Sequence, residues 1–171
     1  VGIGVSSPDT NSKAHIFDSS LSRQLLIQGD TNDAAITVNK SGQSFTFGVD
    51  ASDSNKFKIN TGNTVGAADH ITIDTVGRLL LGTTTEGNAS ADNLTVADSG
   101  DCGLTLRSGT SNYGSIYFSD GTSGDSELKG QIEYNHSTDA LSIYTAGSSA
   151  MRINSSGNVG IGTTSANSLV S

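Results

Sequence analysis

The chain has 171 residues, of which 80 are Gly, Ser, Thr or Asn and only 38 are Leu, Ile, Val or Phe. Charged residues make up 15% of the chain, against about 25% in an average domain, so we expect an ordered chain with a thin core rather than a disordered one. The net charge of −8 excludes nucleic-acid binding by phosphate neutralisation and a polybasic membrane contact.

Two further features are excluded by the residues present. No segment approaches the roughly 18 consecutive apolar residues of a membrane-spanning helix, so no membrane insertion is expected. The single cysteine, Cys102, allows neither an intramolecular disulfide nor a cysteine-based zinc site, and we interpret it as inert.

Short runs of alternating apolar and polar residues follow one another along the chain and predict β-strands with one apolar and one solvated face. Asn, Asp and Gly form the turns between them, and no helix of useful length fits. The runs are 25–27, 36–38, 47–49 and 57–59 in the first half and 104–106, 116–118, 132–134 and 141–143 in the second. The two series align loosely with each other.

A longer motif repeats more closely: residues 70–84 match residues 150–164, and residues 1–7 match the end of a third copy. Each copy predicts a β-hairpin, because two short apolar runs flank a turn that contains Gly77 or Gly157. The residues that define the motif are Gly4, Gly77, Gly82, Gly157, Gly160, Gly162, Ile73, Ile153 and Ile161. We therefore divide the chain into the end of a preceding repeat (1–8), repeat 1 (9–87) and repeat 2 (88–171), and we expect it to belong to a longer polypeptide.

At Gly2 and Gly160, one face of the second hairpin strand carries no side chain. Glycine in a strand suggests that another backbone approaches closely, as where several chains crowd around one axis. A glycine at a surface β-bulge is the alternative interpretation.

The predicted strands bury only two or three side chains each, too few for a small isolated sheet to be stable. Copies wrapped around a common axis would turn their apolar faces inward and pair their free edges. We expect an all-β, elongated repeat fibre of the triple-stranded β-helix or β-prism kind, intertwined from identical chains, although the pattern alone does not distinguish three chains from two.

The motif resembles a known signature. Residues 153–165, Ile-Asn-Ser-Ser-Gly-Asn-Val-Gly-Ile-Gly-Thr-Thr-Ser, resemble the IxxxGNVGIGTTSP signature of tailed-bacteriophage tail fibres and tailspikes. Residues 1–8 and the following 14–16 resemble the same signature and its usual next strand. The match is weaker at 77–84, where Leu79-Leu80-Leu81 replaces Val-Gly-Ile, and Ala166 stands in place of the final Pro.

The resemblance implies a homotrimeric tail-fibre shaft, a structural and adhesive protein of the extracellular virion that contributes to host attachment. The implied partners are identical chains, other virion tail proteins, and a host surface glycan or protein receptor. In that family the motif often precedes a self-cleaving intramolecular chaperone, and cleavage at Ser171 is a hypothesis that follows from the resemblance.

No pattern in the sequence indicates an enzyme, and we expect no catalytic residue and no cofactor. A glycosidase needs two carboxylates across a cleft, but the candidates lie in or beside turn-like segments: Asp120, Asp125, Glu127, Glu133 and Asp139. His15, His70 and His136 are far apart, and no GxSxG elbow is present. The alternative functions are a tailspike-type carbohydrate-degrading enzyme and a bacterial surface adhesin.

Oxygen-bearing side chains alternate over residues 50–55, but this segment lacks the glycine and the distal Glu of an EF-hand. We interpret it as a polar hairpin loop. We expect no metal site from the sequence. The sequence does not decide whether an ion lies on a symmetry axis between chains.

Three tyrosines, Tyr113, Tyr117 and Tyr144, are the candidates for glycan contact. Tyr117 lies between Ile116 and Phe118, and Tyr144 follows Ile143, so alternation places both on the face opposite the apolar residues. An outward tyrosine could stack on a sugar, but the sequence favours the simpler interpretation that these rings cover the shaft or pack on a neighbouring chain.

Overall fold

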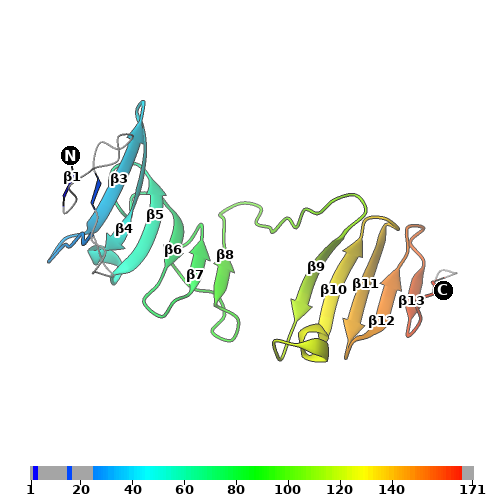
Figure 1. The fold of residues 1–171 in the computed structure, drawn as a ribbon. Coiled ribbons are helices and arrows are strands. Elements are labelled where there is room, and N and C mark those ends of the chain that lie inside the picture. The colour runs from blue at the N-terminus through cyan, green and yellow to red at the C-terminus, as the bar shows by residue number, and fades with distance from the viewer. Residues whose placement is uncertain (1, 4–14, 17–24, 167–171) are drawn as a thin grey trace. The chain divides into compact units, whose positions relative to one another are not determined.

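A computed structural model describes residues 2–3, 15–16 and 25–166 of the chain (Figure 1). The described residues form strands, turns and two short 3-10 helices, which confirms the all-β class. The chain divides into two compact units, Val1–Gly103 and Leu104–Ser171. The predicted intertwining with identical chains involves other copies and is taken up as a proposal below.

Unit 1 holds a six-stranded sheet in the order β3-β4-β5-β6-β7-β8. Its strands are β3 (Ala34–Lys40), β4 (Gln43–Asp50), β5 (Lys56–Thr61), β6 (Asp69–Ile73), β7 (Leu79–Leu81) and β8 (Leu94–Val96), and η1 (Ala51–Asp53) joins β4 to β5. Neighbouring strands are antiparallel except β7 and β8, which are parallel. A separate parallel pair consists of β1 (Gly2–Ile3) and β2 (His15–Ile16).

Unit 2 holds a five-stranded antiparallel sheet in the order β13-β12-β11-β10-β9. Its strands are β9 (Tyr113–Phe118), β10 (Gly130–Asn135), β11 (Ala140–Thr145), β12 (Ser148–Ile153) and β13 (Val159–Ile161), and η2 (Gly124–Leu128) lies between β9 and β10. The hairpins predicted from the repeated motif are confirmed as β6–β7 in unit 1 and β12–β13 in unit 2.

The two hairpin turns share one set of hydrogen bonds. Asp74 Oδ1 accepts from the backbone N–H groups of Val76 and Arg78 at 3.0 Å each. Asn154 Oδ1 accepts in the same way from the backbone N–H groups of Ser156 and Asn158, also at 3.0 Å. Gly77 (φ +91°) and Gly157 (φ +81°) adopt the left-handed backbone that this turn requires. The sequence therefore needs a short side-chain acceptor, Asp or Asn, three residues before the glycine.

Each unit also has a β-bulge at the equivalent place. The register shifts after Ile59 in unit 1 and after Ile143 in unit 2, so one extra residue, His70 or Ala150, bulges from the next strand. The carbonyl group of this extra residue accepts from the N–H of Gly82 (3.1 Å) or Gly162 (2.9 Å). The glycine that closes each motif therefore fastens the end of the hairpin to the bulge.

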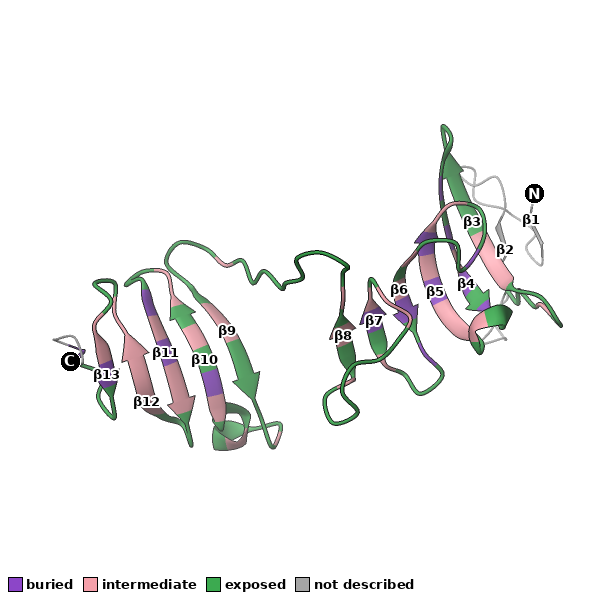
Figure 2. Ribbon diagram, turned by 180° about the vertical axis from the view of Figure 1, so that it is seen from behind, coloured by how far each residue is buried: buried purple, intermediate pink, exposed green. Residues whose placement is uncertain are grey.

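The registers place apolar side chains on one face of each sheet and small or polar ones on the other. In unit 1 the central apolar row is Ile36, Phe47, Ile59, Ile71, Leu81 and Val96. The opposite face carries the most buried residues of the unit, which include Thr46, Asn60, Thr72 and Leu80, as the purple segments of β4 to β7 indicate in Figure 2. The prediction of a solvated polar face is therefore wrong for unit 1.

The loop of residues 62–68, between β5 and β6, covers this polar face. Thr46 Oγ1 donates to the carbonyl of Gly62 (2.7 Å), and Asn60 Nδ2 donates to the carbonyl of Thr64 (2.7 Å). A Cβ atom on Gly66 would lie 2.5 Å from Asp50 Oδ2, so the loop backbone packs directly on the strand side chains. The loop thus supplies hydrogen-bond partners for the Thr46 hydroxyl and the Asn60 amide N–H, whereas Asn60 Oδ1 and Thr72 Oγ1 are buried without one.

A buried ionic cluster lies under the same cover. The ammonium group of Lys58 is 2.9 Å from Asp50, 2.8 Å from Asp53 and 2.8 Å from Asp69. Burial disfavours the charged form of Lys58, but the hydrogen bonds to three carboxylates outweigh this and raise its pKa. Burial also opposes ionisation of Asp50, but hydrogen bonds from Ser52 and Lys58 lower its pKa to about 2. The cluster is therefore charged at neutral pH.

We predict that unit 1 loses stability in acid because of Asp50. Its folded pKa of about 2 lies below the ordinary 3.8, so its contribution is present above about pH 4 and disappears as the pH falls toward 2. The loss is on the order of 2 kcal/mol. Urea denaturation at pH 7, 5, 4 and 3 would measure it.

The Asp50→Asn variant is the control for this prediction. It should be less stable than wild type at pH 7, because one partner of the buried ammonium group is lost, and its stability should depend less on pH. Equal pH dependence in the two proteins would contradict the assignment.

Candidate functional site

The apolar face of the unit 1 sheet is largely uncovered. Two rows cross all six strands without a charged side chain: the central row given above, and a second that consists of Ala34, Val49, Phe57, Ile73, Leu79 and Leu94. Val38 and Phe45 extend the face, with 60% and 50% of their surface exposed. Contiguous exposed apolar surface of this kind marks an interaction site in soluble proteins.

Unit 2 repeats this face in the same register. Its central row is Ile116, Ile132, Ile143, Met151 and Ile161, and the neighbouring row is Gly114, Tyr134, Leu141, Ile153 and Val159. Ile161 keeps 73% of its surface exposed. The motif residues Ile73, Ile153 and Ile161 therefore all lie on apolar faces that the described residues leave largely open.

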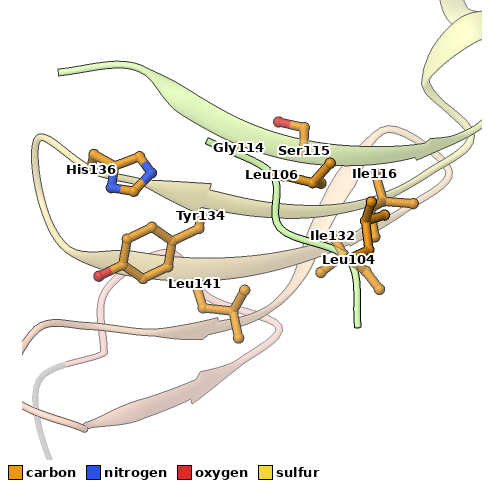
Figure 3. Close-up of a pocket in the computed structure, with 9 residues that line it drawn as sticks. All are labelled: Leu104, Leu106, Gly114, Ser115, Ile116, Ile132, Tyr134, His136 and Leu141. Atoms are coloured by element: carbon orange, nitrogen blue, oxygen red, sulfur yellow. The ribbon is translucent and has the colours of Figure 1, made fainter. Parts of the chain in front are cut away.

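An extended segment that precedes each sheet lies along its apolar face and forms a shallow groove. In unit 2, Leu104 and Leu106 line a groove of about 350 Å³ together with Ile116, Ile132 and Leu141 (Figure 3). The equivalent groove in unit 1, about 190 Å³, is lined by Ile27 with Ile36, Phe47 and Phe57. The prediction that 25–27 and 104–106 are strands is wrong, since neither segment belongs to a sheet. Their predicted alignment nevertheless corresponds to the same position in the two units.

The remaining motif residues shape the backbone. Gly82 (φ +71°) and Gly162 (φ +67°) adopt left-handed conformations and precede a turn in which Thr83 or Thr163 accepts a backbone hydrogen bond at 3.1 Å. Gly4 lies outside the described residues.

The close packing expected at Gly160 exists within the chain itself. A Cβ atom there would lie 3.1 Å from Thr163 Cγ2 and 3.3 Å from Ala166 Cβ. The segment that follows Gly162 folds back over the strand, so residues of the same chain crowd this position, while an approach by neighbouring chains stays a prediction. At the equivalent position of unit 1, Leu80 is completely buried.

We predict that Gly160→Val destabilises unit 2 by about 1–3 kcal/mol, because the larger side chain overlaps the returning segment. Thermal and urea denaturation would measure the loss. Adding Thr163→Ser should recover part of it, because serine removes the crowded methyl group and keeps the hydroxyl that accepts from Ser165. An unchanged melting temperature in Gly160→Val would contradict the assignment.

The three candidate tyrosines lie on the polar face of unit 2, as alternation predicted for Tyr117 and Tyr144. Tyr117 and Tyr144 both pair with Gln131, from opposite sides, so the three form one row across β9, β10 and β11. Tyr113 lies four residues before Tyr117 on the same strand and pairs with Asn135. Tyr113 and Tyr117 are 54% and 49% exposed. Whether they contact a glycan stays a prediction.

The candidate acids are dispersed, with one correction. Glu133 was grouped with acids in or beside turn-like segments, but it lies in the middle of β10 on the tyrosine face, where its Oε1 accepts from the Tyr144 hydroxyl at 3.5 Å. Asp120, Asp125 and Glu127 lie in the connection between β9 and β10, and Asp139 lies in the turn after β10. The strands β9 to β13 carry no second carboxylate beside Glu133.

The loop of residues 50–55 joins β4 to β5, in agreement with its interpretation as a polar hairpin loop. Its carboxylates bind Lys58, an arrangement that sequence inspection missed. The available signal was the alternation Lys56-Phe57-Lys58-Ile59, which places both lysines on the face opposite the apolar residues. Within the described ranges, no group of three or more His, Cys, Asp and Glu side chains could hold a metal ion.

The sequence matches no known family model, and no curated protein matches it. Neither of the helical turns in the described part of the chain has the length or apolar character needed to cross a membrane.

Proposed function

We propose that this chain is a structural segment of a homotrimeric fibre of the kind that forms the tail-fibre shaft of tailed bacteriophages, with a role in host attachment. The observation that carries the proposal is the uncovered apolar face that recurs in the same register on both sheets. Identical chains provide a matching apolar surface for each sheet, and closed symmetry covers every copy equally.

The energetics favour association over an isolated chain. Burial of one large apolar side chain stabilises a structure by about 1.5–3 kcal/mol, and each face presents many that are half-buried or exposed. The buried side of unit 1 is filled instead by polar residues, an ionic cluster and a loop. This distribution is the reverse of that in a self-contained sheet, where the apolar face is the covered one.

The choice of three chains and of a phage fibre depends on the resemblance of residues 153–165 and 1–8 to the tail-fibre signature. The shared turn, bulge and closing-glycine hydrogen bonds support the view that this signature specifies a structural repeat. A carbohydrate-degrading tailspike is the less favoured alternative, because Glu133 has no carboxylate partner on its sheet. A bacterial surface adhesin built from the same repeat is a third candidate.

We predict that light scattering gives a native mass three times that of one chain, and that negative-stain electron microscopy shows rods. A monomer at micromolar concentration would overturn the proposal. A dimeric mass would still support burial of the apolar face between copies, but it would contradict the assignment of three chains. Antibody labelling of phage particles and of bacterial cells would separate a virion fibre from a bacterial adhesin.

We further predict that Ile161→Asp prevents assembly, since a charge buried among apolar side chains is strongly unfavourable. Ile161 is exposed in the single chain, so the substitution should leave each chain folded, with an unchanged circular-dichroism spectrum and a reduced mass by light scattering. Ser155→Asp adds the same charge at an exposed turn position and is the matched control. An Ile161→Asp protein that assembles like wild type would contradict the role of this face.

A further inference from the structure

The polar faces of the two sheets differ although their registers correspond. The bulge and the motif hairpin align the two sheets, so the row Tyr117–Gln131–Tyr144 in unit 2 corresponds to the row Thr37–Thr46–Asn60 in unit 1. In unit 1, Thr46 and Asn60 of this row are buried and hydrogen-bonded to the loop of residues 62–68, while Thr37, whose Oγ1 lies 2.8 Å from Thr46 Oγ1, is exposed. Tyrosine replaces a small polar residue at two positions of this row, and one of them, the position of Asn60 and Tyr144, is covered in unit 1.

Unit 2 lacks the covering loop. Seven residues, 62–68, join β5 to β6, but only Ala146 and Gly147 join the equivalent strands β11 and β12. Ala146 (φ +50°) and Gly147 (φ +73°) form a tight two-residue turn, which is too short to fold back over the sheet. Tyr144 is therefore only half-buried where its counterpart Asn60 is completely buried, and Tyr117 is about half exposed, at a position that is exposed in unit 1 as well.

The open face combines aromatic rings with hydrogen-bonding groups. Beside the tyrosine row runs the row Ser115–Glu133–Ser142–Arg152, and beyond it Tyr113 pairs with Asn135. Adjacent strands lie about 4.8 Å apart, so Tyr117 and Tyr144, two strands apart, are separated by about 10 Å. The hydroxyl of Tyr144 makes only a 3.5 Å contact with Glu133, and Arg152 Nη1 only a 3.3 Å hydrogen bond to Ser142 Oγ. Donors and acceptors on this face are therefore left with capacity for a ligand.

We propose that the polar face of unit 2, defined by Tyr113, Tyr117, Glu133, Tyr144 and Arg152, binds an extended oligosaccharide chain. Tyrosine provides a large, rigid contact surface with a polar tip at low entropic cost, which suits the apolar ring faces and hydroxyl edges of pyranose sugars. Glu133 and Arg152 supply the carboxylate and guanidinium groups that hydrogen-bond sugar hydroxyls, while Gln131 between the two tyrosines is buried and donates to the carbonyl of Leu128 at 3.4 Å.

The chemistry of this face favours a sugar over other ligands. It carries one carboxylate and one guanidinium group in the same row and therefore has little net charge, which disfavours a polyphosphate chain. The sheet face is broad and has no large aliphatic side chain, whereas the centre of a protein–protein contact is usually apolar. The large aliphatic residues of unit 2 lie on the opposite face, so glycan binding is compatible with the proposed trimer. The inference specifies the ligand class of the attachment role proposed above.

The test is binding of the full chain to an array of immobilised neutral and N-acetylated hexose oligosaccharides and purified bacterial surface polysaccharides, followed by calorimetry with the best soluble oligosaccharide. Tyr117→Ala and Tyr144→Ala should each weaken binding by roughly tenfold or more. Tyr117→Phe keeps the ring and should retain most of the affinity. Thr37→Ala, at the position equivalent to Tyr117 in unit 1, is the matched control and should bind like wild type.

Light scattering on the same samples separates the two proposals. A trimer whose glycan binding is lost in the alanine variants supports both. Absence of binding to every sugar on the array, or binding that survives the double variant Tyr117→Ala/Tyr144→Ala, overturns the glycan site, even where the trimer is intact. Binding by a protein that is monomeric supports the glycan site and rejects the fibre.

Discussion

The structure depends on which face of each sheet the chain covers for itself. Small polar side chains can be buried under a loop, because loop carbonyl groups accept their hydrogen bonds. An apolar face needs another apolar surface, and among the described residues only short segments, 25–27 and 104–106, lie near it. Unit 1 therefore covers its polar face with its own loop and leaves much of its hydrophobic burial to a second surface, which we propose is provided by identical copies.

The local hydrogen bonds of the motif are the same in both units although the side chains around them differ. Asp74 is paired with Arg78, which also reaches Asp92 at 2.7 Å and so fastens the segment after the hairpin. In unit 2, Asn154 does this directly, since its Nδ2 donates to the carbonyl of Ala166 at 2.7 Å. Both copies of the repeat thus share the turn, the bulge and the fastening of the returning chain. The fastening is made by ion pairs of Arg78 in unit 1 and by the neutral amide of Asn154 in unit 2.

Much of the fold could be read from the sequence, and the reasons for the failures are specific. Alternation gave the strands and the face of Tyr117, and the turn residues gave the hairpins, because both signals are local. Burial of the polar face could not be read, since it depends on a loop whose packing involves distant strands. Lys58 meets acids from β4, η1 and β6, which no spacing along the chain brings together. Crowding at Gly160 was expected, but the contribution of Thr163 and Ala166 could not be read, because it depends on how the chain folds back after Gly162.

The parallel strand after the hairpin has a consequence for how such a chain can change in evolution. β8, which follows the motif, pairs in parallel with the outer strand of the β6–β7 hairpin, and β2 pairs in parallel with β1, the end of the preceding copy. The described strands form three sheets, and none of these sheets takes strands from both units. A duplication or deletion of one whole copy in the gene would therefore leave the remaining sheets with their own partners, and the length of the protein can vary in integral steps without a new fold.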